Sequence, residues 1–93
     1  MVVGSCKIYL YAPWVTSLKE KRMVVKSLIE KTRHKFNVSV AEVGENDTHK
    51  TIVLGFAFVT NEKSHGDSIM DNVLNYIENN TDAVIESIET ELL

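Results

Sequence analysis

The sequence predicts a small α+β fold in which four strands and two helices follow one another in the order βαββαβ. Four segments are rich in valine, isoleucine and aromatic residues and are bounded by proline, glycine or asparagine, which is typical of strands. Two segments between them repeat apolar residues at helical spacing. The length of 93 residues leaves room for one core, so a single domain covering 1–93 is expected.

The first half of the chain supplies a strand and a basic helix. The strand covers Val2–Ala12 and ends at Pro13. Ser17 followed three residues later by Glu20 forms a capping box, so the helix is expected to begin there. Its apolar residues keep helical spacing up to about Lys35, where the helix should end.

The second half supplies the remaining three strands and the second helix. The segments "NVSVAEVG" (37–44) and "TIVLGFAFVTN" (51–61) predict two strands, joined by the polar turn "ENDTHK" (45–50). Asn61 or Ser64 is expected to cap the second helix, which "NNTD" (79–82) ends. The segment "AVIESIETEL" (83–92) predicts the last strand.

This order of elements is that of the ferredoxin-like sandwich, a four-stranded antiparallel sheet with both helices on one face. The other face of the sheet is then left open. Side chains alternate along a strand, so Lys7 shares this face with the tyrosines of the first strand. If the small residues of the third strand lie beneath the helices, the open face presents five large apolar or aromatic residues: Tyr9, Tyr11, Leu54, Phe56 and Phe58.

An exposed apolar surface of this kind usually marks a contact site. The segments "IYL" (8–10) and "GFAFV" (55–59) resemble the two short motifs of RNA recognition motif domains, whose aromatic side chains stack on bases. That interpretation assigns Tyr9, Phe56 and Phe58 to RNA, although Leu54 and Asn61 depart from the motif. The alternative is that the same face is buried in a homodimer.

Charge is segregated along the chain, whose net charge is −3. Seven of the residues in 17–36 are basic and two are acidic, whereas from Glu62 onward eight acids accompany one lysine. On a helical wheel four cations fall within a sector of roughly 60° beside the apolar face. We call this set the cationic stripe: Lys19, Arg22, Lys26 and Arg33. The stripe is either a solvated helix face or a surface that follows RNA phosphates.

Lys21 differs from these cations because it lies within the apolar sector of the helix, where an unpaired charge is costly. Glu42 shares parity with Val38 and Val40, so its carboxylate should point toward the helices. The start of the helix and the end of the second strand lie at the same end of the sheet. We therefore expect a Lys21–Glu42 ion pair, with a structural role favoured over a catalytic one.

The sequence offers no convincing catalytic, cofactor or metal site. Cys6 is expected to be a buried thiol in mid-strand, and His34, His49 and His65 lack metal-ligand spacing. The loop "APWVTS" (12–17) lacks the glycines and the arginine of an acylphosphatase phosphate loop. Trp14 in that loop either covers the edge of the core or anchors an interface. No cofactor, small-molecule substrate or enzymatic activity is expected.

The whole chain resembles the YlxP-like family of short bacterial proteins. The resemblance rests on "SLKEKR" (17–22), "FNVSVAEV" (36–43) and the leucine, glycine, valine and asparagine of the segment 54–61. It implies a ferredoxin-like domain of unknown function, without established catalytic residues. The neighbourhood of the family's genes to those for transcription-elongation and translation-initiation factors implies ribosome or RNA work.

Together these features predict a non-enzymatic cytoplasmic protein, since a single cysteine fits a reducing compartment and no apolar run is long enough for a membrane span. We expect it to form a homodimer through its open sheet and to bind RNA or a ribosomal partner through the basic helix. The alternative is a homo-oligomeric protein-binding or regulatory module without nucleic-acid contact.

Overall fold

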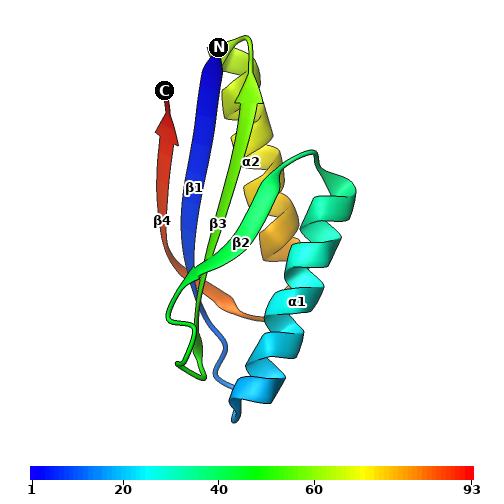
Figure 1. Ribbon diagram of the computed structural model, residues 1–93, viewed down its shortest axis with the longest axis vertical. Coiled ribbons are helices and arrows are strands. Elements are labelled where there is room, and N and C mark those ends of the chain that lie inside the picture. Colours follow the sequence, from blue (N-terminus) through cyan, green and yellow to red (C-terminus); the bar gives the residue numbers. More distant parts are fainter.

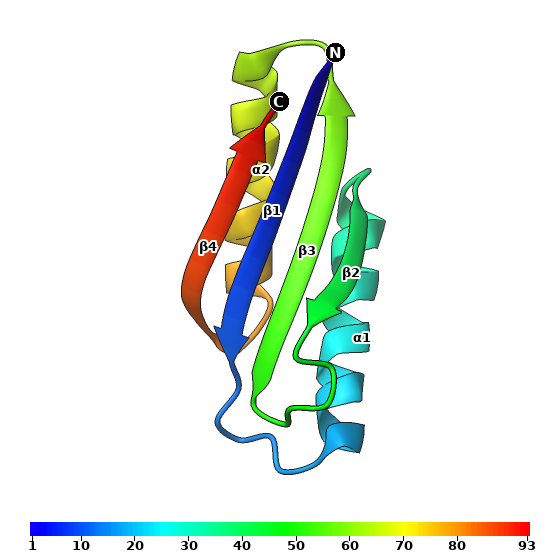
Figure 2. The ribbon, with the colours of Figure 1, turned by 60° about the vertical axis from the view of Figure 1, so that its left-hand side comes forward.

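The computed structural model describes all 93 residues and has the predicted order of elements (Figure 1). They are β1 (Val2–Tyr11), α1 (Leu18–Lys35), β2 (Ser39–Gly44), β3 (Thr51–Thr60), α2 (Lys63–Asn79) and β4 (Val84–Leu92). The strands form one antiparallel sheet in the order β2-β3-β1-β4. Both helices cover one face of the sheet, and Figure 2 looks on to the other face. The predicted ferredoxin-like fold is confirmed.

The start of α1 follows the predicted capping box with one change. The Ser17 hydroxyl accepts a hydrogen bond from the Glu20 backbone N–H at 3.1 Å. The Glu20 carboxylate in turn accepts from the Thr16 N–H at 2.8 Å, which is one residue before the cap. Side chains therefore satisfy one unpaired backbone donor of the first helical turn and one donor of the loop before the cap.

The start of α2 differs from the prediction that Asn61 or Ser64 caps it. Glu62 occupies the cap position and its side chain makes no capping hydrogen bond. The reason is the short connection, because β3 continues to Thr60 and α2 already begins at Lys63. Asn61 consequently precedes the cap position, and Ser64 lies inside the first helical turn.

The register between β1 and β3 corrects the prediction for the open face. Gly4, Cys6 and Ile8 are the partners of Phe58, Phe56 and Leu54. Directly opposite residues of an antiparallel pair share a face of the sheet. Cys6 and Ile8 face the helices, so the three β3 residues do too.

Leu54, Phe56 and Phe58 are accordingly core residues, with 1%, 3% and 6% of their surfaces exposed, and their assignment to the open face was wrong. Burying two phenylalanines and a leucine beneath the helices removes more apolar surface from water than burying Gly55 and Ala57 would. Gly4 makes the arrangement possible, because a Cβ there would overlap the Phe58 ring. Tyr9 and Tyr11 lie on the open face as predicted, between residues of β1 that point into the core.

Candidate functional site

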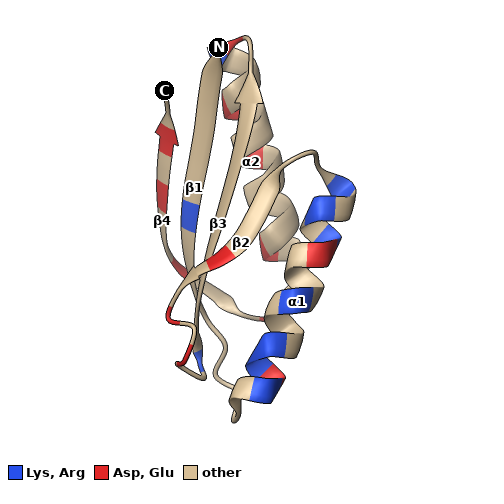
Figure 3. Cartoon of the chain, in the orientation of Figure 1, with Lys and Arg blue, Asp and Glu red and all other residues tan.

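The cationic stripe belongs to α1, whose basic residues are blue in Figure 3. Lys19, Arg22 and Lys26 are exposed, and neither a hydrogen bond nor a salt bridge ties them to the rest of the chain. Arg33 is exposed as well, but its guanidinium Nη2 donates to the Val40 carbonyl oxygen at 3.2 Å. Val40 belongs to β2, an edge strand of the sheet, so this bond joins the C-terminal end of the stripe to that strand.

The predicted ion pair between Lys21 and Glu42 is present, and it is the one salt bridge of the structure. Lys21 is 1% exposed, and its Nζ lies 3.1 Å from Glu42 Oε2. The same ammonium donates to the Glu45 carbonyl oxygen, and Glu42 Oε1 accepts from Asn46 Nδ2 at 3.3 Å. Neither Lys21 nor Glu42 lines either of the two hollows described below. The pair therefore fastens the start of α1 to the turn after β2, which is a structural role.

Lys50 makes a second anchor that the sequence did not reveal. Its Nζ donates to the carbonyl oxygens of Pro13 and Val15 at 2.6 and 2.8 Å, and its own carbonyl accepts from the Ala12 N–H at 2.8 Å. These bonds hold the β1–α1 loop on both sides of Trp14. No local pattern marks such a lysine, because its partners lie about three dozen residues away in the chain.

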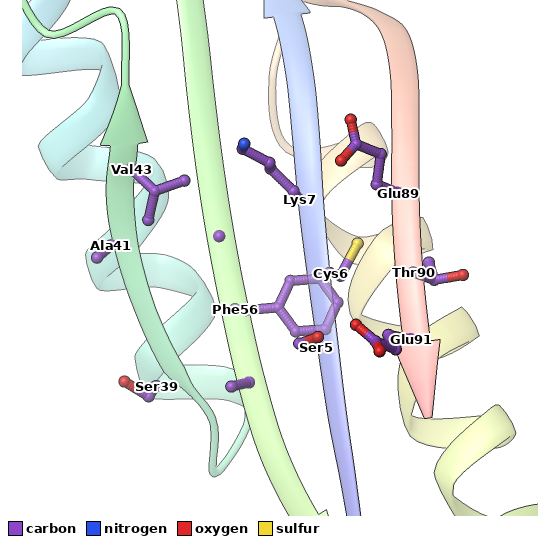
Figure 4. A pocket seen from close by; sticks show the side chains of 12 residues that line it. Ser5, Cys6, Lys7, Ser39, Ala41, Val43, Phe56, Glu89, Thr90 and Glu91 are labelled. Carbon is purple, nitrogen blue, oxygen red and sulfur yellow. The ribbon is translucent and has the colours of Figure 1, made fainter. Parts of the chain in front are cut away.

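The open face of the sheet is hollowed at its centre, with a volume of about 420 Å³ (Figure 4). Small residues form the floor of this hollow, and three charged side chains stand over it. The small residues are Ser5, Ala41, Gly55 and Ala57, and the charged ones are Lys7, Glu89 and Glu91.

Lys7 and Glu89 are cross-strand neighbours that do not pair with each other. Their Cα atoms are partners between β1 and β4, yet no salt bridge joins them. Figure 4 shows Lys7 leaning toward β3, away from Glu89. The Lys7 ammonium lies 5.6 Å from the ring centroid of Tyr9, within the range of a cation–π contact. The carboxylates of β4 thus remain without a protein partner.

The burial of Phe56 and Phe58 also overturns the predicted stacking platform for RNA bases. Of the three aromatic residues assigned to base stacking, Tyr9 alone lies on the open face. The likeness of "GFAFV" to an RNA recognition motif therefore reflects a buried central strand, in which aromatic residues serve the core.

The remaining nucleophilic and metal-binding side chains are either buried or far from one another. Burial raises the pKa of the Cys6 thiol from 9.0 to about 11, so the nucleophilic thiolate is suppressed at neutral pH. No group of three or more histidine, cysteine, aspartate and glutamate side chains is placed to hold a metal ion. Neither helix combines the length and the apolar character that a membrane span requires.

Trp14 lies at the surface, with 41% of the residue exposed. It lines a second, smaller hollow between α1 and the connection from α2 to β4. Its neighbours Ala12 and Val15 are fully buried, so the loop is fixed while the indole remains accessible.

These features define a single ferredoxin-like domain with a basic helix, an open sheet and two shallow hollows. The likeness to solved structures agrees with that class. A de novo designed protein with a ferredoxin fold superposes with a TM-score of 0.60 at 15% identity, covering 99% of this chain and 85% of that chain. The de novo designed protein Foldit4 superposes with a TM-score of 0.51 at 14% identity, covering 99% and 94%.

The chain belongs to the family described as "Protein of unknown function (DUF503)", whose model matches residues 3–90. It is also 36% identical over 75 residues to the "Uncharacterized protein YlxP" of Bacillus subtilis (strain 168). That alignment covers 81% of this chain and 79% of the relative. The resemblance to YlxP-like proteins is confirmed.

Proposed function

We propose that this protein is a non-catalytic RNA-binding module that contacts the phosphate backbone through the exposed cations of α1. The observation that carries the proposal is the absence of any internal counterion for Lys19, Arg22 and Lys26. Cations that have no carboxylate partner in the fold are available to a polyanion, and binding releases counterions from that polyanion.

The distribution of charge supports the same proposal. Six of the eight acids from Glu62 onward lie on α2 and β4, whereas seven of the ten basic residues lie on α1 (Figure 3). This separation gives α1 a positive field despite the net charge of −3, and such a field attracts nucleic acid over a distance of about 10 Å at moderate salt. Two observations support the non-catalytic part of the proposal: Cys6 is buried with a raised pKa, and Lys21 is paired with Glu42.

The test is an anisotropy titration of a labelled single-stranded RNA at two salt concentrations. Three phosphate contacts predict a salt slope of about −2, so a fourfold rise in salt should weaken binding about 20-fold. The variant Lys19→Gln, Arg22→Gln, Lys26→Gln should lose most of the affinity and most of the slope. Arg33 is left intact because it supports β2.

A matched control removes three positive charges elsewhere. Lys7, Lys35 and Lys63 lie on the open face, in the last turn of α1 and at the start of α2. Their replacement by glutamine gives the same net charge as the stripe variant. Equal losses in the two variants would mean that net charge, and not the stripe, governs binding, and would refute the proposal.

A second candidate is a homo-oligomeric module that pairs through the open sheet face and binds protein alone. It is favoured by the charges that remain unpaired there, because Lys7 of one copy would meet Glu89 or Glu91 of a second copy across a two-fold axis. The small floor residues allow two sheets to approach closely. Light scattering at micromolar concentration tests this candidate, and a monomer would exclude it.

If a dimer is found, charge reversal identifies the surface. Lys7→Glu should dissociate the dimer, and Glu89→Lys in the same chain should restore it. A dimer that is indifferent to both changes would use another surface.

A further inference from the structure

We propose that the hollow beside Trp14 binds a single unpaired base of RNA, with guanine preferred. This inference rests on the proposed function, because it identifies which part of an RNA the protein would read. The hollow has a volume of about 330 Å³, at the lower end of the range of roughly 300–1,000 Å³ that small-molecule sites occupy.

The first argument is that Trp14 is exposed on a fixed backbone. Lys50 bonds the carbonyl oxygens on either side of it, and the buried Val15 side chain holds the loop from within. Because the backbone that carries this accessible indole is already fixed, stacking of a base on the ring does not have to order the loop as well. Met23, which is 66% exposed, lines the same hollow and adds a polarizable surface for the base.

The second argument is charge complementarity along α1. Lys19, Met23, Ser27 and Lys31 follow one another at intervals of four residues, so they form one ridge of the helix. The two middle residues line the hollow. The two lysines lie one helical turn to either side, or about 6 Å along the axis. A base in the hollow would therefore have a cation near the phosphate on each side.

The third argument concerns the far wall, which Asn80, Thr81 and Asp82 supply. The Asn80 Nδ2 donates to the Tyr76 carbonyl at 2.8 Å, which leaves the amide oxygen as an acceptor. Asp82 is exposed, and no hydrogen bond or salt bridge engages its carboxylate. The Thr81 hydroxyl already accepts from the Ala83 N–H at 3.1 Å, so the acceptors that this wall leaves free are the Asn80 amide oxygen and the Asp82 carboxylate. Two such acceptors favour a base edge with adjacent N–H donors, and the Watson–Crick edge of guanine presents two.

The chain's only tryptophan is Trp14, so its fluorescence reports directly on the hollow. The experiment compares a short oligouridine with the same oligomer carrying one central guanosine. RNA anisotropy measures binding of any kind, and tryptophan emission measures occupation of the hollow. We expect saturable quenching by the guanosine oligomer and an affinity about tenfold higher than that of oligouridine.

Three variants make the test specific. Asp82→Asn should abolish the preference for guanosine, so that the variant binds the guanosine oligomer no more tightly than oligouridine. Asp71→Asn, on the exposed side of α2, removes the same charge and should keep the tighter binding of the guanosine oligomer. Trp14→Ala should weaken binding of the guanosine oligomer about tenfold in the anisotropy assay. Melting curves of each variant verify that it is folded, as expected for substitutions of exposed side chains.

The outcomes separate this proposal from the proposed function. RNA binding that depends on the cationic stripe but leaves tryptophan emission unchanged overturns the base site alone. If no RNA binds at low salt, the proposed function fails, and a titration with guanosine monophosphate decides the hollow by itself. Quenching then supports a nucleotide site, and its absence overturns it. An emission change that follows protein concentration without RNA would show that a second chain covers the hollow, which also overturns the proposal.

Discussion

The buried ammonium of Lys21 gives the sharpest prediction about stability. Lys21→Met keeps the apolar stem of the side chain and removes its charge. The Glu42 carboxylate then loses its ion-pair partner, and the Glu45 carbonyl loses its donor. We expect the variant to be less stable, because a carboxylate left in a mostly buried site has to be desolvated without compensation.

The magnitude follows from the exposure of the two partners. Removing one member of a fully buried pair typically costs about 3–5 kcal/mol. Lys21 is 1% exposed, but the Glu42 side chain is 17% exposed and keeps a hydrogen bond from Asn46, so water and the amide offset part of the loss. We therefore expect a loss of about 2–4 kcal/mol. For a domain of this size that lowers the Tm by about 10–20 °C.

Thermal and urea denaturation followed by circular dichroism measure this loss. Lys26→Met on the exposed side of the same helix is the matched control, with an expected change within about 0.5 kcal/mol. The double variant Lys21→Met, Glu42→Met should be more stable than Lys21→Met alone, because it leaves no unpaired carboxylate. A Lys21→Met variant as stable as the wild type, or a double variant that sums two independent losses, would refute the structural role.

Three further predictions follow from the packing. Gly4→Ala should lower the free energy of unfolding by about 1–3 kcal/mol in urea melts, because the new Cβ would overlap the buried Phe58 ring. Gly55→Ala should cost less, because its Cβ would meet the exposed Val43 side chain, which can rotate away. Burial raises the pKa of Cys6 from 9.0 to about 11, so between these pH values the folded state keeps a proton that the unfolded state releases. The free energy of unfolding should therefore fall as the pH rises from about 9 toward 11. A Cys6→Ala variant should lack this component of the decline. Lys50→Met should free the β1–α1 loop and lower the steady-state fluorescence anisotropy of the chain's one tryptophan, and an unchanged anisotropy would contradict the anchoring role.

The sequence was sufficient for the elements whose signals are local. Ser17 caps α1 as predicted, because the cap and the donor it satisfies are three residues apart. The ion pair between Lys21 and Glu42 was also predictable, since a charge within an apolar helix face requires a partner and strand parity indicated which carboxylate could reach it.

The central strand β3 shows where local pattern fails. Both of its faces carry apolar residues, so alternation does not indicate which set is buried. The choice is made by the partner strand, where Gly4 provides the space that the Phe58 ring fills. Because side chains alternate along a strand, choosing the wrong set of β3 residues as buried assigned Leu54 and Phe56 to the open face, although both belong to the core. Lys50 was missed for a related reason, because its partners are distant in the chain.

The two buried or partly buried lysines act at the same end of the molecule. Lys21 joins the start of α1 to the turn after β2, and Lys50, at the end of that turn, joins it to the loop before α1. The loop, the first turns of the helix and the β2–β3 turn are thus one connected unit, and this unit presents both Trp14 and the first residues of the cationic stripe. Lys21 and Lys50 therefore hold in position the part of α1 that carries the first exposed cations of the stripe. If the proposed RNA binding is measured, its loss in a Lys21 or Lys50 variant would therefore report on the position of the proposed contact surface, whereas its loss in a Lys19 variant would report on the contact itself.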